Sequence, residues 1–217
     1  MPMILSGSLK GGSGKTTLAV NLAVMRVRAG HSVLLVDADP QESASMWASV
    51  RSENHDLPAI VCVIKRGRIG RDILEMRSRF DTIIIDAGGR DSVELRNALA
   101  ICDATLVTVK PSQFDTWSLD HMAMLLREIE ERTNVRPPAL VLLNAVNANP
   151  QLKEVEEVRE VIADYVDVLP MMPGRVSDRV SFRRAARDGM GVVELQGRFA
   201  DKSGVAEMQA VYGVLFQ

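Results

Sequence analysis

Residues 10–17 read Lys10-Gly11-Gly12-Ser13-Gly14-Lys15-Thr16-Thr17, and this stretch decides the fold. The apolar run Met3-Ile4-Leu5 comes shortly before it, and a segment with helical spacing of Ala, Leu and Val follows it, so the stretch lies on a turn from strand to helix. Glycines in such a turn let backbone N–H groups gather around phosphate oxygens, and the start of the helix adds its positive dipole end. The stretch therefore predicts a phosphate-binding loop.

The residue types within the loop indicate its chemistry. We expect Lys15 to reach the β- and γ-phosphates of a nucleoside triphosphate, and the Thr16 hydroxyl to ligate Mg²⁺. The usual loop has a glycine six residues before this lysine, where the present chain has Leu9, and here a second lysine stands at position 10. The expected nucleotide contacts within the loop are Lys10, Gly11, Gly12, Ser13, Gly14, Lys15, Thr16 and Thr17.

Length and composition indicate an ordinary globular protein. A chain of 217 residues is long enough for one domain with a substantial core, and we expect residues 1–217 to form a single domain. No segment resembles a signal peptide or a membrane span, which predicts a cytoplasmic protein. Cys62 and Cys102 lie in apolar stretches without metal-type spacing, so we expect reduced, buried thiols. The net charge of −2 shows no overall basicity that would point to nucleic acid.

Apolar runs alternate with helical patterns along the whole chain. The expected strands cover residues 3–9, 32–36, 59–63, 82–85, 104–109, 139–143 and 166–169. The expected helices cover residues 16–28, 41–51, 70–79, 92–100, 116–132, 152–164, 177–187 and 205–215. Continuous apolar strands are buried on both faces, so the sequence predicts an α/β fold with a mostly parallel, twisted sheet covered by helices on both sides, of the P-loop NTPase type.

Acidic residues follow two of the expected strands, at the edge where a parallel sheet binds its ligands. Asp37 and Asp39 come at the end of the second strand, and Asp86 ends the fourth. A carboxylate directly after a buried apolar strand is costly unless it faces a cation or water, so we expect Asp86 and Asp37 to lie at the Mg²⁺. A structural role for Asp37, as a helix cap or in an ion pair, remains open. Gly88-Gly89 supplies a turn that could move with the γ-phosphate.

Together these motifs resemble the deviant Walker A ATPases of the ParA/MinD class. The resemblance rests on Lys10 to Thr17, Asp37-Ala-Asp-Pro-Gln, Asp86-Ala-Gly-Gly and Pro111-Ser-Gln-Phe-Asp115, and it covers essentially the whole chain. It is strongest with the small ParA-type DNA-partition ATPases that lack an N-terminal DNA-binding domain, and Trp47 also fits their pattern. One departure is Asp86-Ala-Gly-Gly, where many relatives carry Asp-x-Pro-Pro or Asp-x-Pro-Gly.

The resemblance implies roles for individual residues and a working cycle. Lys10 and Lys15 would act at the phosphates, with Lys10 crossing an ATP-bound homodimer to the partner's nucleotide, and Asp39 would position the attacking water. Pro111 and Asn144 would lie near the base. The implied activity is slow, partner-stimulated hydrolysis of ATP with Mg²⁺. The implied partners are nonspecific double-stranded DNA and a centromere-binding or cargo adaptor protein, in a nucleoid-associated protein that does not bind a membrane.

An arginine-rich segment near residue 180 is the candidate DNA surface. Arg179, Arg183 and Arg187 recur every four residues, which predicts one face of a helix that is capped by Ser177. The expected DNA contacts are Arg175, Arg179, Arg183, Arg184 and Arg187. Such a stripe would touch phosphates and read no bases. A merely solvated helix face remains the alternative, and a second basic cluster spans residues 65–71.

Two other function classes use the same nucleotide loop. A membrane-associated positioning ATPase of the Min type would need a basic, amphipathic C-terminal helix, whereas residues 202–217 carry one lysine and read as a packing helix. An iron–sulfur relative would need cluster-ligating cysteines, and neither cysteine of this chain lies in such a motif. For a synthetase of the same superfamily we find no substrate motif.

Overall fold

The computed structural model describes residues 1–147 and 154–216, apart from the side chains of residues 113–116 and 154. The strands are β1 (Met3–Gly7), β2 (Val33–Ala38), β3 (Val61–Ile64), β4 (Thr82–Ala87), β5 (Ala104–Val109), β6 (Ala139–Val146) and β7 (Met171–Ser177). The helices are α1 (Lys15–Arg28), α2 (Ser43–Ser52), α3 (Gly70–Met76), α4 (Val93–Ile101), α5 (Gln113–Thr133), α6 (Glu154–Ala163), α7 (Val180–Arg187) and α8 (Lys202–Phe216). Short 3₁₀ turns are η1 (Arg77–Arg79), η2 (Val192–Glu194) and η3 (Gly197–Phe199).

The strands form one seven-stranded sheet in the order β3-β2-β4-β1-β5-β6-β7. Each neighbouring pair is parallel, so the expectation of a mostly parallel sheet is confirmed. The order reverses between β4, β1 and β5, and the loops after these strands therefore open toward one crevice. The phosphate-binding loop follows β1, the central strand of the sheet.

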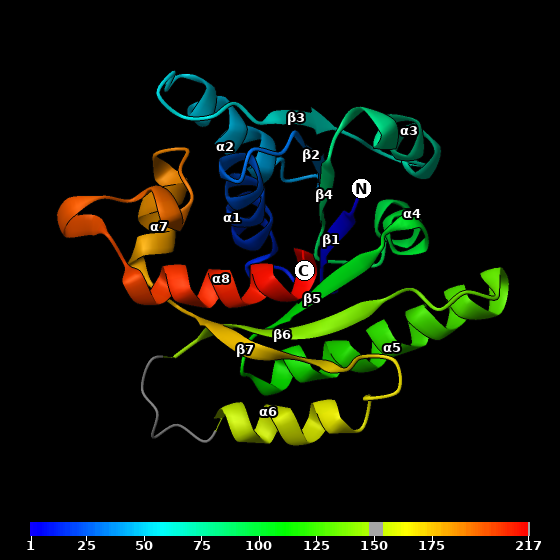
Figure 1. Ribbon diagram of the computed structural model, residues 1–217. Helices are drawn as coiled ribbons and strands as arrows, with labels where there is room; N and C mark the ends of the chain where they lie inside the picture. The colour runs from blue at the N-terminus through cyan, green and yellow to red at the C-terminus, as the bar shows by residue number, and fades with distance from the viewer. Residues whose placement is uncertain (148–153, 217) are drawn as a thin grey trace.

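Helices cover both faces of the sheet (Figure 1), as expected. Leu34 on β2 points to one core, which α3, α4, α5 and α6 close, whereas Leu35 points to the other core, which α1, α2, α7 and α8 close. This alternation follows from the period of two along a strand, because successive side chains leave opposite faces. Both faces are apolar, which explains why the strands read as continuous apolar runs.

The last strand differs from its prediction. An expected strand at 166–169 is wrong: β7 is Met171–Ser177, although Val168 and Leu169 are buried in the core. The strand contains Pro173 and Gly174, and both residue types are uncommon inside strands, so the sequence pattern does not indicate a strand here. Strand β7 lies at the edge of the sheet, where a proline can be tolerated because its missing N–H need not bond to a second neighbouring strand. The register between β6 and β7 also shifts twice.

The start of the arginine-rich helix also differs. The helix expected from Ser177 begins at Val180 instead, since Ser177 is the last residue of β7 and is not a helix cap. The Ser177 hydroxyl donates to the Glu207 carboxylate at 2.8 Å. The helix expected from residue 152 is α6, and its first two expected residues, 152 and 153, lie outside the described residues.

Candidate functional site

The loop between β1 and α1 is shaped by glycines in the left-handed region. Gly12 has φ +73° and Gly14 has φ +88°, conformations that residues with a Cβ rarely adopt. Two side chains from neighbouring strands brace the loop: the Ser13 and Thr108 hydroxyls are 2.7 Å apart, and the Asn144 amide donates to the Ser13 carbonyl at 2.6 Å. The loop is therefore held in a defined shape by contacts to β5 and β6.

Lys15 lies at the first position of α1 and folds back over its own loop. Its ammonium donates to the Lys10 carbonyl oxygen at 3.0 Å, and the residue is only 5% exposed. Burial lowers the pKa of Lys15, while the carboxylates of Asp86 and Asp39 act in the opposite direction. Such a buried cation beside backbone N–H groups suits an anionic ligand. Lys10 is half-buried at the start of the loop.

Thr16 and Asp86 meet at the base of the crevice. The Thr16 hydroxyl donates to Asp86 Oδ2 at 2.6 Å, and Asp86 is fully buried at the end of β4. Burial raises the pKa of Asp86 to about 7, against the hydrogen bond from Thr16, which lowers it. Among the described side chains, Asp86 Oδ1 has no hydrogen-bond partner. A buried carboxylate oxygen without a partner beside a hydroxyl is a donor set that Mg²⁺ fits.

The two carboxylates after β2 have different surroundings. Asp37 is fully buried and accepts the backbone N–H groups of Asp39 at 3.1 Å and Ser45 at 2.8 Å, so it stabilises the start of α2. Its pKa is raised by burial, which the two N–H donors partly offset. Asp39 is half-buried, and its Oδ1 accepts the Gln41 backbone N–H at 2.9 Å. Asp39 thus faces the crevice, whereas Asp37 lies beneath it and has a structural role, because it accepts hydrogen bonds from the backbone at the start of α2.

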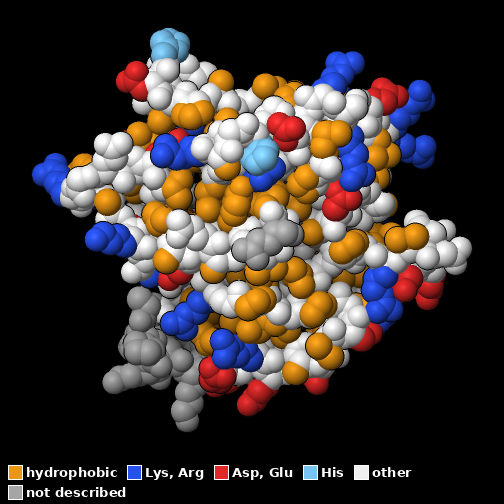
Figure 2. All heavy atoms as spheres, viewed as in Figure 1, with side chains coloured by type: hydrophobic (Ala, Val, Ile, Leu, Met, Phe, Trp, Pro, Cys, Tyr) orange, Lys and Arg blue, Asp and Glu red, His pale blue; other side chains and the backbone are white. Residues whose placement is uncertain are grey.

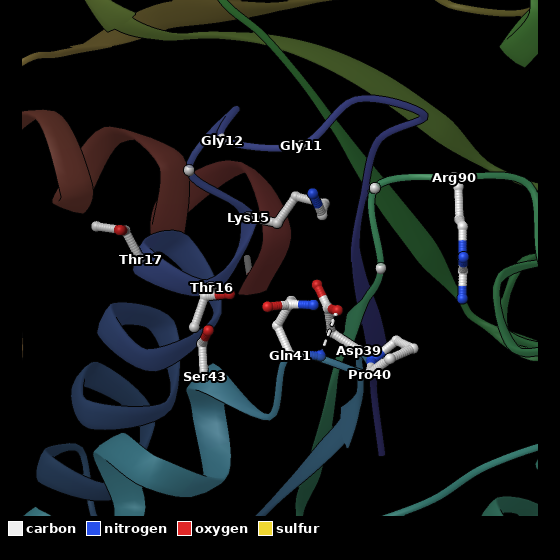
Figure 3. A pocket seen from close by; sticks show the side chains of 13 residues that line it. Gly11, Gly12, Lys15, Thr16, Thr17, Asp39, Pro40, Gln41, Ser43 and Arg90 are labelled. Atoms are coloured by element: carbon white, nitrogen blue, oxygen red, sulfur yellow. Dashed lines mark hydrogen bonds between the residues drawn. The ribbon is translucent and has the colours of Figure 1, made fainter.

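A cavity of about 550 Å³ lies between the loop and these strand ends (Figure 3). Figure 3 shows Lys15, Asp39 and Gln41 around the same space. Its described lining comprises Gly11, Gly12, Gly14, Lys15, Thr16, Thr17, Asp39, Pro40, Gln41, Ser43, Gly88, Gly89 and Arg90. The volume is in the range of small-molecule sites. Pro40, Gln41, Ser43 and Arg90 were not expected there; Arg90 follows the two glycines of the turn and had no motif to reveal it.

The turn after β4 touches the phosphate-binding loop. A Cβ on Gly89 would lie 2.6 Å from the Gly11 nitrogen and 2.7 Å from the Lys10 carbonyl, which is closer than packed atoms come. A Cβ on Gly88 would make only ordinary contacts, 3.4 Å from Pro40 and 3.5 Å from Asp39. Glycine at position 89 therefore lets two backbones meet, whereas position 88, which the proline of Asp-x-Pro-Gly would occupy, has room for a side chain.

The residues expected near the base lie outside the cavity lining. Pro111 follows β5 and is half-buried, and Asn144 is 5% exposed with its amide on the Ser13 carbonyl. Neither appears among the described residues that line the cavity. Of the adjoining motif, the side chains of residues 113–115 lie outside the described residues.

The arginine segment is not one helical stripe. Arg179 precedes α7 in extended conformation, and its guanidinium binds the Glu207 carboxylate of α8 at 2.7 and 3.1 Å. The predicted face shared by Arg179 and Arg183 is therefore wrong, because the helix starts one residue after Arg179. Arg183 is paired with Asp178 and Arg187 with Asp188 at 2.7 Å. Arg175 is exposed on β7.

The other basic cluster has local partners. Arg66 donates to the carbonyls of Asp37 at 2.8 Å and Asp39 at 2.9 Å and binds Glu42, so it fixes the loop after β2. Lys65 pairs with Asp72 at 2.6 Å. Cys102 is buried, as expected, whereas Cys62 is only half-buried. Burial raises the pKa of both thiols, that of Cys62 to about 12, which disfavours the reactive thiolate.

The C-terminal helix packs as expected. Met208 and Val211 of α8 are buried in the core with α1, and Arg26 of α1 donates to the Tyr212 hydroxyl at 3.0 Å. No helix within residues 1–147 and 154–216 combines the length and apolarity that a bilayer crossing requires.

Comparisons with known proteins agree with this site. The model of the CobQ/CobB/MinD/ParA nucleotide binding domain matches residues 4–192. The chain is 27% identical over 192 residues to maintenance of carboxysome distribution protein A of Halothiobacillus neapolitanus, covering 88% of this chain and 86% of that one. It is 27% identical to chromosome partitioning protein ParA of Caulobacter vibrioides, covering 80% and 81%.

A solved structure shares the fold. The putative plasmid partition protein of Borrelia burgdorferi, bound to AMPPNP, superimposes with a TM-score of 0.73 at 18% identity and covers 98% of this chain and 97% of that one. The match of the domain model to most of the chain, over a fold and loop of the P-loop type, settles the family: the chain belongs to the CobQ/CobB/MinD/ParA nucleotide-binding family, whose ParA and MinD members are P-loop ATPases.

Proposed function

We propose that this protein is an ATPase that dimerises with ATP, binds double-stranded DNA without sequence preference and positions a cargo through an adaptor protein. The observation that carries the proposal is the joint presence of Lys15 and Lys10 in a loop that Thr108 of β5 and Asn144 of β6 brace. Relatives named for chromosome partitioning and for carboxysome distribution support a positioning role, with a plasmid or chromosome as the cargo that we favour.

Each residue of the site has a separate role in binding or hydrolysing the triphosphate. Lys15 neutralises the β- and γ-phosphates, and the N–H groups from Gly11 to Thr17 surround their oxygens. Thr16 and Asp86 would hold Mg²⁺, which would neutralise phosphate charge as the γ-phosphate leaves. Asp37 supports this region by fixing the start of α2. Asp39, which faces the cavity, orients the attacking water.

Dimerisation follows from the second lysine. One protomer's loop provides Lys15, and Lys10 of the partner subunit completes the positive surroundings of the γ-phosphate. ATP then stabilises the dimer by differential binding, and hydrolysis removes the contact that favours it. We expect turnover to be slow until an adaptor stimulates it.

A membrane-associated Min-type ATPase is the alternative. Burial of Met208 and Val211 argues against it, since α8 uses its apolar side for the core and does not offer it to lipid. In the proposed model the protein works in the cytoplasm on the nucleoid.

The test combines assembly and binding. Light scattering with size-exclusion should give dimers with a nonhydrolysable ATP analogue and monomers with ADP. The ATP state should then co-sediment with plasmid DNA and leave vesicles of anionic lipid in the supernatant. Binding to vesicles alone would favour the Min-type alternative, and monomers in every nucleotide state would contradict the dimer. Lys15→Ala is the control that should remove all nucleotide dependence.

A further inference from the structure

The aromatic ring of Phe199 contacts the guanidinium groups of two arginines from different segments. The Arg184 guanidinium of α7 lies 4.2 Å from the ring centroid, and that of Arg198 in η3 lies 4.8 Å from it. Both distances fall within the range of attractive cation–π contacts. Phe199 itself is 38% exposed, so the group lies at the surface.

These two arginines differ from the others of the segment. Over residues 1–147 and 154–216, Arg184 and Arg198 have no hydrogen bond or ion pair to a carboxylate within 4 Å, whereas Arg179, Arg183 and Arg187 each have one. Two like charges against one ring repel each other. Asp188, which is paired with Arg187, interacts electrostatically with Arg184 but forms no ion pair with it within 4 Å. A polyanion that approaches this ring meets two guanidinium groups that are not directly paired with a carboxylate among the described residues.

The loop that carries Arg198 is anchored. Asp201, just after η3, accepts the Ser181 hydroxyl of α7 at 2.6 Å and the Gly204 backbone N–H at 2.9 Å. Arg179 supports the same corner through Glu207 and through Asp201 at 3.7 Å. The start of α7, the start of α8 and the loop between them are thus tied together, which limits how far Arg198 can move away from Arg184.

We propose that Arg184, Phe199 and Arg198 form the centre of the surface that binds DNA phosphates, and that Arg179 is a structural residue of that corner. This inference rests on the proposed function and names the residues of its DNA surface. Lys and Arg side chains project at the left edge of Figure 2, where Figure 1 places α7 and the loop after it. Nonspecific binding fits such a group, because guanidinium groups at the surface can contact phosphates without reading base edges.

The assay measures the affinity of the ATP-bound protein for a fluorescent duplex of mixed sequence over a range of salt concentrations. Arg184→Gln with Arg198→Gln should weaken binding at least tenfold. The slope of log affinity against log salt should become shallower by about 2 per protomer, since two phosphate contacts are lost. The matched control is Arg132→Gln with Arg159→Gln, two exposed arginines on α5 and α6 at the opposite face of the sheet, which should leave the slope unchanged.

Phe199→Leu separates charge from positioning. This variant keeps both charges and an apolar side chain but removes the π face, so affinity should fall about threefold to tenfold while the salt slope stays as in the parent. ATP binding measured in parallel shows that each variant is folded.

The outcomes distinguish this inference from the proposed function. If the parent binds DNA and the Arg184/Arg198 variant binds equally well with the same slope, the arginine–phenylalanine group is not the contact surface. If the parent binds no duplex in any nucleotide state, or binds anionic vesicles in its place, the DNA function itself fails and the inference fails with it.

Discussion

Arg51 and Glu194 form a two-pronged ion pair inside the protein, with both N–O distances at 2.9 Å and both side chains at most 2% exposed. Arg51 also donates to the carbonyls of Pro58 and Gly189, and Glu194 accepts the Gly191 N–H at 2.9 Å. The pair joins the end of α2 to the segment after α7. Since α2 begins beside Asp37 and Asp39, the Arg51–Glu194 pair connects the nucleotide site, through α2, with the segment that follows α7.

Removing the charge of Glu194 should destabilise the fold strongly. Glu194→Gln leaves the Arg51 guanidinium buried without a countercharge, and breaking a buried pair in this way costs about 3–5 kcal/mol of unfolding free energy. Urea unfolding measures the loss. The matched control is Glu156→Gln on α6, whose exposed partner is Arg159 and which should change stability by less than about 1 kcal/mol. Equal effects of the two variants would refute a buried role for the pair.

Asp86→Asn should stabilise the nucleotide-free protein at high pH. The folded pKa is about 7 and the ordinary value is 3.8, so the unfolded chain loses this proton first as pH rises. The contribution of Asp86 to the free energy of unfolding therefore decreases as the pH rises from about 4 to 7, and it is constant above that range. Asparagine removes the penalty, which gives the variant an advantage at pH 8 with an upper limit of about 4 kcal/mol and no advantage at pH 4.

The same substitution should lose the stabilisation that Mg²⁺ with ATP gives the parent, because the buried anion is absent. Thermal unfolding at pH 4 and 8, with and without Mg²⁺ and ATP, measures both effects. Asp120→Asn, an exposed acid on α5, serves as the control. A variant that is less stable than the parent at pH 8 without ligand would show that Asp86 is ionised at no cost in the fold.

The sequence predicted the sheet and the loop well because both depend on local signals. Apolar runs marked β1, β2, β4, β5 and β6, and glycine spacing marked the turn into α1. Strand β7 was missed because its pairing with β6 is a long-range contact that overrides the poor strand propensity of Pro173 and Gly174.

The arginine segment shows a second limit. A spacing of four residues predicted that Arg179 and Arg183 share a face, but Glu207 is 28 residues away from Arg179 in sequence and holds it outside the helix. Likewise, nothing in the local sequence connects Arg184 with Arg198, which come together only through the Phe199 ring. Contacts between distant residues decide which charges are neutralised, and one sequence does not contain that information.

Lys10→Ala should separate nucleotide binding from assembly. Lys15 and the loop amides remain, so a monomer should bind a fluorescent ATP analogue within about threefold of the parent. Loss of the lysine that serves the partner's phosphate should abolish the ATP-dependent dimer in light scattering. An equally stable ATP dimer would refute the role across the interface. Lys65→Ala, outside the site and paired with Asp72, is the control.

The turn after β4 gives a test with neighbouring residues. At position 89 a methyl group would lie 2.6 Å from the Gly11 nitrogen, so Gly89→Ala must push the turn away from the phosphate-binding loop. Overpacking of this kind costs about 1–3 kcal/mol, and we expect ATP affinity to fall about tenfold or more.

At position 88 the methyl group would meet Pro40 at 3.4 Å and Asp39 at 3.5 Å, which is ordinary contact, so Gly88→Ala should bind ATP within about threefold of the parent. Both variants lose the same flexibility of glycine, and only one of them collides with backbone. Titration of a fluorescent ATP analogue compares them directly. If the two variants lose ATP affinity equally, glycine is required here for the flexibility of the turn. The backbone contact between Gly89 and Gly11 would then not determine the shape of the site.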